Sequence, residues 1–215
     1  MKTCDILLTG VGGQGVVTLG DLIARAALAA DVPVAYVPSK GMAQRGGFVE
    51  VEIRLGQEAA GPRISAKGAD LVLAMERSES LKGIAFVKPE GRFVLYDHVW
   101  EPTGVLLGEH EYPAQSNVLS ALQESCREVV CLNPADRPSF DQQPVAANIY
   151  ALGALAGSEA LQTMIDSCML QEAVVTRWPK AAESNLAAYQ AGFVKGNQPI
   201  GQFLGDARNT TLERS

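Results

Sequence analysis

The sequence has few of the side chains that build metal and redox centres. Its 215 residues include two histidines and four cysteines, and no two cysteines form a C-x-x-C pair. This scarcity argues against a histidine-rich metal site, a zinc knuckle or a cysteine-ligated cluster. We expect the cysteines to be buried or semi-buried free thiols in a reducing compartment.

Long apolar runs and excess positive charge are also absent. No stretch approaches the roughly 20 apolar residues that span a bilayer, and the opening segment MKTCDILLTG does not read as a signal peptide. The net charge is −6, without the basic stripe of a nucleic-acid binder. We therefore expect a cytoplasmic protein that binds neither membranes nor nucleic acid.

Instead, the sequence alternates apolar strands with amphipathic helices. Residues 4–9 predict a strand, residues 16–30 a helix with one buried face, and residues 32–39 a second strand. This order is the βαβ pattern of a sheet with helical crossovers.

Two further runs extend the predicted sheet. Residues 47–56 alternate strictly, which indicates an antiparallel or edge strand with Glu52 on its wet face. Residues 69–76 are continuously apolar, as is typical of a central parallel strand. The other predicted elements are a strand within 59–64, a helix at 78–87 capped by Ser78, strands at 92–96 and 127–133, and helices at 116–125, 146–157, 158–170 and 181–193.

These elements predict a three-layer, Rossmann-like α/β fold. The sheet should be mostly parallel, with one antiparallel excursion after residue 46 and with helices at the C-terminal end of the chain. We expect residues 1–195 to form one domain and residues 196–215 a C-terminal tail.

The first glycine turn joins the first strand to the first helix. Gly10, Gly12 and Gly15 match the G-x-G-x-x-G dinucleotide pattern, and N–H groups at a helix start favour an anion. The second strand, however, ends in V-P-S-K-G, without the acidic residue that holds a ribose, and no G-K-[ST] follows the turn. The turn is therefore an incomplete NAD site, and a turn without a ligand stays open. Gln14 would contact either a ligand or the local backbone.

A second glycine-rich loop, S-K-G-M-A-Q-R-G-G, follows the second strand. Arg45 offers a planar fork for a carboxylate or phosphate. Both loops leave the carboxyl ends of their strands, where ligands bind in parallel α/β sheets, so we expect them to lie side by side. The alternative is a surface connection with a solvated arginine.

Two other polar groups have competing interpretations. Asp97 and His98 follow a predicted strand and suggest a general base, but no nucleophile motif accompanies them, so a structural loop is favoured. Trp178 either anchors a partner subunit or packs within this chain.

The motifs GVGGQG and GMAQRGG together resemble the gamma-type domain of the 2-oxoacid:ferredoxin oxidoreductases. Further similarity lies in ADLVLAME, KPEGRFVLYD, NIYALG and RWPKAAESNLAAYQAGF, so that the resemblance covers roughly residues 4–195. Within the family, the second motif is most similar to the small subunit of the indolepyruvate enzymes. Residues 1–195 would then form the gamma-type domain.

The resemblance implies an enzyme that oxidatively decarboxylates a 2-oxoacid, forms an acyl-CoA and reduces ferredoxin. In the two-subunit enzymes, the large subunit carries thiamine diphosphate, Mg and [4Fe-4S] clusters, and the small subunit is the gamma-type domain alone. The chain agrees with this division, because it has neither a C-x-x-C-x-x-C run nor a G-D-G motif with a distant Asn-Asn pair.

By this resemblance, the chain completes the active site for indolepyruvate or another aryl pyruvate at the subunit interface. Arg45 and Gln44 are the candidate catalytic residues. Lys40 adds a cation that the family's pattern does not lead us to expect, which leaves the substrate open. The candidate cofactor-binding residues, with coenzyme A at or near the interface, are Gly12, Gly13, Gln14, Gly15, Ser39, Lys40, Gly41, Met42, Gly46, Gly47 and Asn148. Asn148 would position the loop or cap a helix.

Two other functions stay open. The chain could be a stand-alone nucleotide-binding oxidoreductase, or a non-catalytic assembly module. No metal ligand is predicted in either case.

Overall fold

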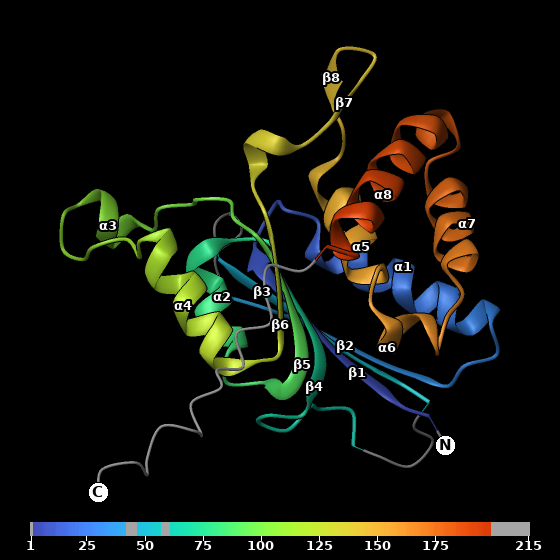
Figure 1. Cartoon of the computed structure of the whole chain (residues 1–215), viewed down its shortest axis with the longest axis horizontal. Helices are drawn as coiled ribbons and strands as arrows, with labels where there is room; N and C mark the ends of the chain where they lie inside the picture. Colours follow the sequence, from blue (N-terminus) through green and yellow to red (C-terminus); the bar gives the residue numbers. More distant parts are fainter. Residues whose placement is uncertain (1, 42–46, 57–60, 199–215) are drawn as a thin grey trace, which may run out of the picture.

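The computed structural model describes residues 2–41, 47–56 and 61–198 and has the predicted three-layer α/β architecture (Figure 1). Its sheet is formed by β1 (Cys4–Val11), β2 (Val34–Lys40), β3 (Phe48–Leu55), β4 (Ala69–Ala74), β5 (Val87–Tyr96) and β6 (Glu128–Leu132). The strand order is β2-β3-β1-β4-β5-β6. Neighbouring strands from β1 to β6 are parallel, whereas β3 is antiparallel to both β1 and β2.

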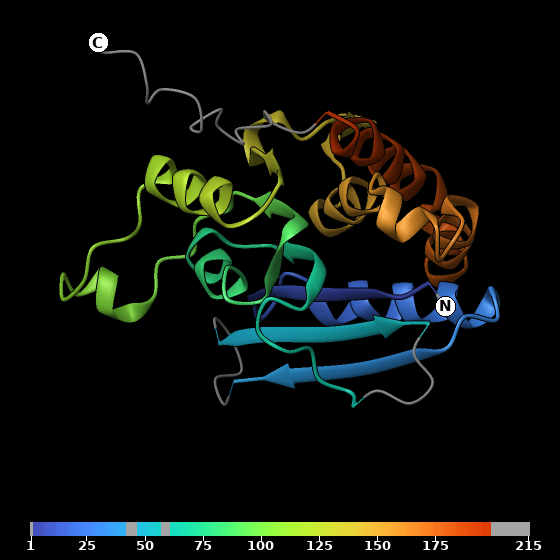
Figure 2. The ribbon, with the colours of Figure 1, turned by 60° about the horizontal axis from the view of Figure 1, so that its bottom comes forward.

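Helices cover both faces of the sheet (Figure 2). One face packs against α1 (Val16–Ala29), α5 (Ala147–Ala156), α6 (Glu159–Gln162), α7 (Ser167–Arg177) and α8 (Ala182–Gly196). The other face packs against α2 (Arg77–Gly83) and α4 (Gln115–Ser125), while α3 (Thr103–Leu106) lies in a projecting lobe. A separate hairpin joins β7 (Ser139–Phe140) to β8 (Gln143–Pro144), and the 3-10 turns are η1 (Pro134–Asp136) and η2 (Pro179–Ala181).

The two hydrophobic cores follow from the alternation of side chains along each strand. In β1, Ile6 and Leu8 belong to the core beneath α1 and α5, whereas Leu7 belongs to the core beneath α4. Because β1 is buried on both faces, residues 6–8 at its centre form an apolar run rather than an alternating pattern. Trp178 is half-buried and packs against the first core, so the predicted contact within this chain is present.

The alternating strand differs from its prediction in two respects. β3 is antiparallel to its neighbours, which was one of the two predicted alternatives. It lies inside the sheet, however, and not at its edge. The predicted wet face is wrong at Glu52, which is only 2% exposed. The chain after β3 folds back over the strand, so that Arg63 pairs with the Glu52 carboxylate and the Ile64 N–H donates to it.

Several element boundaries were also predicted wrongly. Glu76, not Ser78, caps α2, because its carboxylate accepts from the backbone N–H of Glu79. The strand predicted at 92–96 begins at Val87, and the helix predicted at 158–170 is split into α6 and α7. No strand forms at residues 61–64, the described part of the element predicted within 59–64. Of the predicted tail, residues 199–215 lie outside the described residues.

Helices α5 and α8 approach each other closely enough for their backbones to touch. A Cβ atom added at Gly192 would lie 1.9 Å from the Tyr150 carbonyl oxygen, and one added at Gly153 would lie 2.0 Å from the Tyr189 carbonyl oxygen. Neither contact can be relieved by rotating a flexible side chain. Glycine is therefore required at these helix positions despite its low helix propensity.

We predict that Gly192→Ala lowers the free energy of unfolding by about 1–3 kcal/mol, because it overpacks this helix contact. Helix propensity alone would instead raise stability by about 1 kcal/mol, so the sign of the change identifies the dominant effect. Urea denaturation of the full chain measures it. Gly61→Ala is the control, since a Cβ at Gly61 meets no atom within 4 Å. A Gly192→Ala chain as stable as wild type would contradict the close packing.

Candidate functional site

The two glycine-rich loops meet at one edge of the sheet. The Gly12 N–H donates to the Gly47 carbonyl oxygen at 2.9 Å, and the Gly41 N–H donates to the Phe48 carbonyl oxygen at 2.9 Å. The antiparallel β3 causes this contact, because it starts where β1 and β2 end: Phe48 pairs with Val11, at the end of β1. The predicted adjacency of the loops is confirmed for these residues. Met42, Gln44, Arg45 and Gly46 lie outside the described residues.

A cavity of about 690 Å³ opens between the ends of these strands. Its lining includes several predicted residues, namely Gly12, Gly13, Gly15, Lys40 and Gly41, together with Phe48. The Phe48 side chain is 43% exposed and adds an apolar wall. Ser39 does not line this cavity; its Oγ accepts a hydrogen bond from Arg63 at 3.3 Å.

The first glycine turn has a backbone that only glycine adopts readily. Gly13 has φ 102° and Gly15 has φ 79°, both in the left-handed region. Gly15 is the N-cap of α1 and provides no side-chain cap, so N–H groups of the first helical turn face this edge of the sheet. A Cβ added at Gly15 would also lie 2.5 Å from the Asn148 side-chain nitrogen.

The Gln14 side chain connects three segments at this edge. Its Oε1 accepts from the Val11 N–H at 2.9 Å, and its Nε2 donates to the Met75 carbonyl oxygen at 2.8 Å. The same Nε2 lies 3.4 Å from His98 Nδ1. Gln14 thus braces the turn against the ends of β4 and β5, which is the local role that its sequence position left open.

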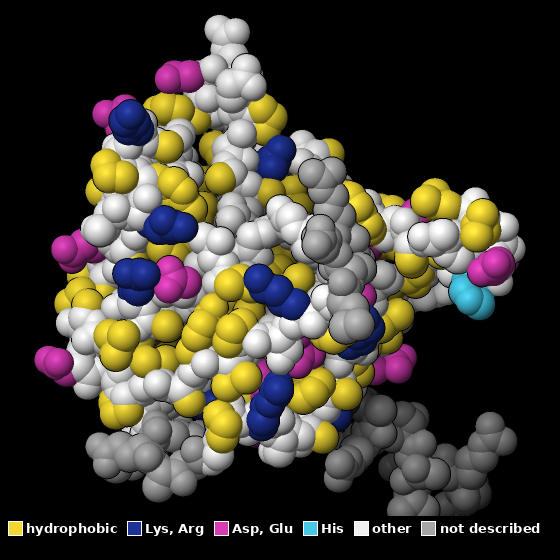
Figure 3. All heavy atoms as spheres, turned by 180° about the vertical axis from the view of Figure 1, so that it is seen from behind, with side chains coloured by type: hydrophobic (Ala, Val, Ile, Leu, Met, Phe, Trp, Pro, Cys, Tyr) yellow, Lys and Arg dark blue, Asp and Glu magenta, His cyan; other side chains and the backbone are white. Residues whose placement is uncertain are grey.

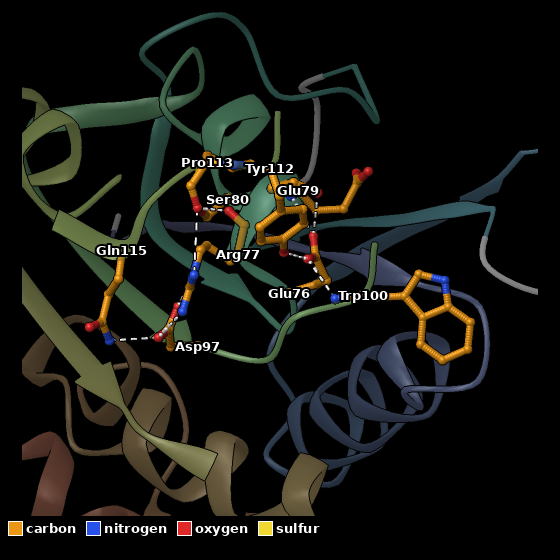
Figure 4. Close-up of polar contacts among 10 residues, drawn as sticks. Glu76, Arg77, Glu79, Ser80, Asp97, Trp100, Tyr112, Pro113 and Gln115 are labelled. Carbon is orange, nitrogen blue, oxygen red and sulfur yellow. Dashed lines mark hydrogen bonds and ion pairs between the residues drawn. The ribbon is translucent and has the colours of Figure 1, made fainter. Parts of the chain in front are cut away.

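Glu76 forms a buried junction at the end of β4 (Figure 4). Its carboxylate is 0% exposed and accepts from the Glu79 N–H at 2.8 Å, the Ser78 hydroxyl at 2.6 Å and the Trp100 N–H at 3.2 Å. The Tyr112 hydroxyl donates to it as well. Burial and this hydrogen bond raise the pKa of Tyr112, so the phenol keeps its donor proton. Several donors thus compensate for the burial of the carboxylate.

An adjacent ion pair holds the same segment of chain. Arg77 forms two hydrogen bonds with Asp97, at 2.6 and 2.8 Å, and Gln115 Nε2 donates to Asp97 at 2.6 Å. Asp97 is 6% exposed, so this pair is largely shielded from solvent. Asp97 therefore pairs with Arg77 and not with His98, in agreement with the structural interpretation of the Asp-His sequence.

These two networks anchor a lobe formed by residues 98–113, which includes α3. The space-filling view in Figure 3 shows hydrophobic side chains on the projecting lobe. Leu106 and Leu107 are 69% and 68% exposed, and Val99 and Trp100 at the base are 42% and 45% exposed. Because the lobe starts at the carboxyl end of β5, it belongs to the same edge of the molecule as the glycine turn. Its apolar surface is suited to contact with another protein.

A second cavity, of about 410 Å³, lies on the other side of the first glycine turn. Gly13, Gln14 and Gly15 line it together with His98, Arg137 and Asn148. Asn148 is in the first turn of α5, and its Oδ1 accepts from the Ile149 N–H at 3.0 Å. The structure therefore brings Asn148 to the first glycine turn. Arg137 and Tyr112 were missed at the sequence level, because neither belongs to a local motif.

The described residues do not bring together the side chains that commonly bind a metal ion. Within 2–41, 47–56 and 61–198, no group of three or more His, Cys, Asp or Glu side chains is placed to hold one. Burial raises the pKa of both Cys126 and Cys131 to about 11, so these thiols are protonated at neutral pH. In the same part of the chain, no helix is both long and apolar enough to cross a membrane.

Comparisons with known proteins agree with this architecture. The chain is similar to the indolepyruvate oxidoreductase subunit IorB of Archaeoglobus fulgidus, with 32% identity over 91% of this chain and 95% of that protein. It is similar in fold to the gamma subunit of a keto/oxoacid ferredoxin oxidoreductase from Geobacter sulfurreducens, with a TM-score of 0.63, 23% identity, and coverage of 90% of this chain and 98% of that chain.

A third similarity is to part of a longer protein. The 2-oxoglutarate:ferredoxin oxidoreductase of Magnetococcus marinus, solved with 2-oxoglutarate, coenzyme A and succinyl-CoA bound, has a TM-score of 0.64 and 18% identity. The match covers 94% of this chain but 32% of that chain. The family described as pyruvate ferredoxin/flavodoxin oxidoreductase matches residues 5–194. By this match and by the identity to IorB, the chain belongs to the pyruvate ferredoxin/flavodoxin oxidoreductase family.

Proposed function

We propose that this chain is the small subunit of a 2-oxoacid:ferredoxin oxidoreductase and that it completes an active site whose cofactors are held by a larger subunit. The observation that supports the proposal is the hydrogen bond between Gly12 of the first motif and Gly47 of the second, at one edge of the sheet. Ligands of open α/β sheets bind at the carboxyl ends of the strands. That edge also carries the exposed apolar lobe, so the site and the subunit contact would be continuous.

The substrate we propose is indolepyruvate or another aryl pyruvate. Its oxidative decarboxylation would yield CO₂ and an acyl-CoA, and its two electrons would reach ferredoxin through the complex. Thiamine diphosphate, Mg and the [4Fe-4S] clusters would be held by the larger subunit and would supply the carbanion and electron-transfer chemistry. The complex would act in the cytoplasm.

The contribution of this chain would be to bind and orient. Arg45 and Gln44, which precede Gly47 in the sequence of the second loop, would contact the substrate carboxylate or coenzyme A. Lys40 and the N–H groups at the start of α1 would favour an anionic group, and Phe48 would contact an apolar one. The remaining predicted residues of the loop, Met42 and Gly46, would shape it.

We predict that Arg45→Ala lowers kcat/KM of the assembled complex by about 10- to 100-fold, because a charged hydrogen bond to substrate contributes about 1.5–3 kcal/mol. The assay follows ferredoxin reduction by complexes that contain wild-type chain, variant chain or no chain. Arg127→Ala is the matched control, since Arg127 is exposed at the start of β6, on the opposite edge.

The outcomes separate the candidate functions. Unchanged turnover in Arg45→Ala would mean that the loop does not contact the reactants, which favours an assembly module. Equal turnover without any chain would contradict the proposed function itself.

We predict that replacing both Leu106 and Leu107 by Ser weakens binding of the larger subunit at least about tenfold, because interface leucines would become polar. Affinity measured by biolayer interferometry tests this, with Leu28→Ser as the control. Leu28 is 65% exposed on α1, away from the lobe. An equal loss of affinity in the control, or none in the double variant, would place the interface elsewhere.

A further inference from the structure

A groove lies between α1 and α7, which pack side by side on one face of the sheet (Figure 1). It has a volume of about 530 Å³ and is lined by the last turns of α1 and by one face of α7. Leu28, on the α1 side, is 65% exposed, and Met169 lines the α7 side. An exposed leucine beside an open groove is the kind of surface that binds another protein.

The α7 side of the groove has the spacing of a seam between paired helices. Met169, Ala173 and Thr176 line it, and they are four and three positions apart. This is the spacing of the d, a and d positions of a heptad repeat, at which one helix packs against another. The neighbouring face of α7 is already used, because Leu170 and Val174 are buried in the first core. The seam is therefore a second packing surface on the same helix.

Two charged residues flank this seam. Glu172 directly precedes Ala173 and is a g position, whereas Arg177 is the last residue of α7 and is an e position. Both are exposed and line the groove, and neither takes part in the ion pairs formed among the described residues. The Arg177 guanidinium lies over the Trp178 ring, 5.7 Å from its centroid. Charges on one helix pair at three or four positions, and these two are five apart, so they do not satisfy each other within α7.

We propose that this groove is an interface between two copies of the chain, whose α7 helices run parallel across a two-fold axis. In a parallel helix pair, the charged g and e positions of the two helices form ion pairs across the seam. Glu172 of each copy is thereby placed against Arg177 of the other, and the symmetry forms this contact twice. Leu28 and Met169 of both copies supply the apolar part of the interface.

The occupant is a second copy because the groove carries both charges of the pair. A two-fold interface uses the same patch on both partners, so the patch must be complementary to itself. A groove for a strongly acidic or basic partner would carry charges of one sign instead. The other arginine that lines the groove, Arg25, pairs with Asp21 of its own helix at 2.8 Å, which leaves Arg177 for the second copy.

This interface does not depend on the proposed function. α1 begins beside the first glycine turn, at the carboxyl edge of the sheet, whereas the groove lies along its last turns. The surfaces for a second copy and for the larger subunit are therefore separate. Leu28→Ser should accordingly weaken the dimer and leave binding of the larger subunit unchanged, so the two interfaces can fail independently.

Sedimentation velocity of the full chain tests the proposal, because it measures the equilibrium between monomer and dimer. We expect Glu172→Arg and Arg177→Glu each to raise the dissociation constant at least about tenfold, since like charges then meet at both symmetric contacts. The variant with both substitutions exchanges the two charges and should bind more tightly than either single variant. Glu124→Arg makes the same change of charge at an exposed position of α4 and should dimerise as wild type does.

The recovery in the double variant distinguishes a contact between copies from an effect within one chain. The proposal is overturned if the wild-type chain stays monomeric at about 0.1 mM, or if the double variant binds no more tightly than the single ones. It is also overturned if Glu124→Arg weakens the dimer as much as Glu172→Arg. Loss of binding to the larger subunit in the single variants, with a monomeric wild type, would instead assign the groove to that subunit. Circular dichroism of each variant establishes that the fold is retained.

Discussion

The hydrogen bond from the Gly12 N–H to the Gly47 carbonyl oxygen determines the arrangement of the whole functional edge. It exists because β3 is inserted antiparallel between β1 and β2, so that one strand begins where its two neighbours end. Strands are spaced by about 4.8 Å, which leaves roughly 10 Å between the ends of β1 and β2. The larger cavity occupies the space above that gap, and residues from all three strand ends line it.

The edge combines rigid support with accessible binding groups. Gln14 uses its amide to fix the glycine turn against β4, and Glu76 uses its buried carboxylate to fix the lobe. Both side chains find their partners within the chain, and the N–H groups at the start of α1 are left to face this edge of the sheet. This division suits a subunit that orients ligands whose chemistry is performed by cofactors elsewhere.

Local patterns in the sequence predicted the fold class, the βαβ start and the two glycine loops. These features depend on short-range signals: apolar runs, strict alternation and glycines between strand and helix. Alternation could not place β3 inside the sheet, since an edge strand and an internal antiparallel strand have the same period. Nor could it reveal the burial of Glu52, which requires the chain after β3 to fold back.

Contacts in the candidate site between residues far apart in the sequence could not be predicted either. Glu76 and Tyr112 are separated by 36 positions, and Arg137 reaches the first glycine turn only through the packing of η1 and α5. No motif connects such residues before the chain is folded. The number and spacing of the cysteines were sufficient to predict free thiols, but the predicted burial is wrong for Cys168, which is exposed.

Hydrogen exchange of the chain alone and within the assembled complex tests the central claim most directly. If the carboxyl edge of the sheet faces the larger subunit, amides at residues 12–17 and 98–113 will exchange more slowly in the complex. Amides at residues 31–33 and 65–68, on the opposite edge, will be unchanged. Protection confined to that opposite edge would contradict the account.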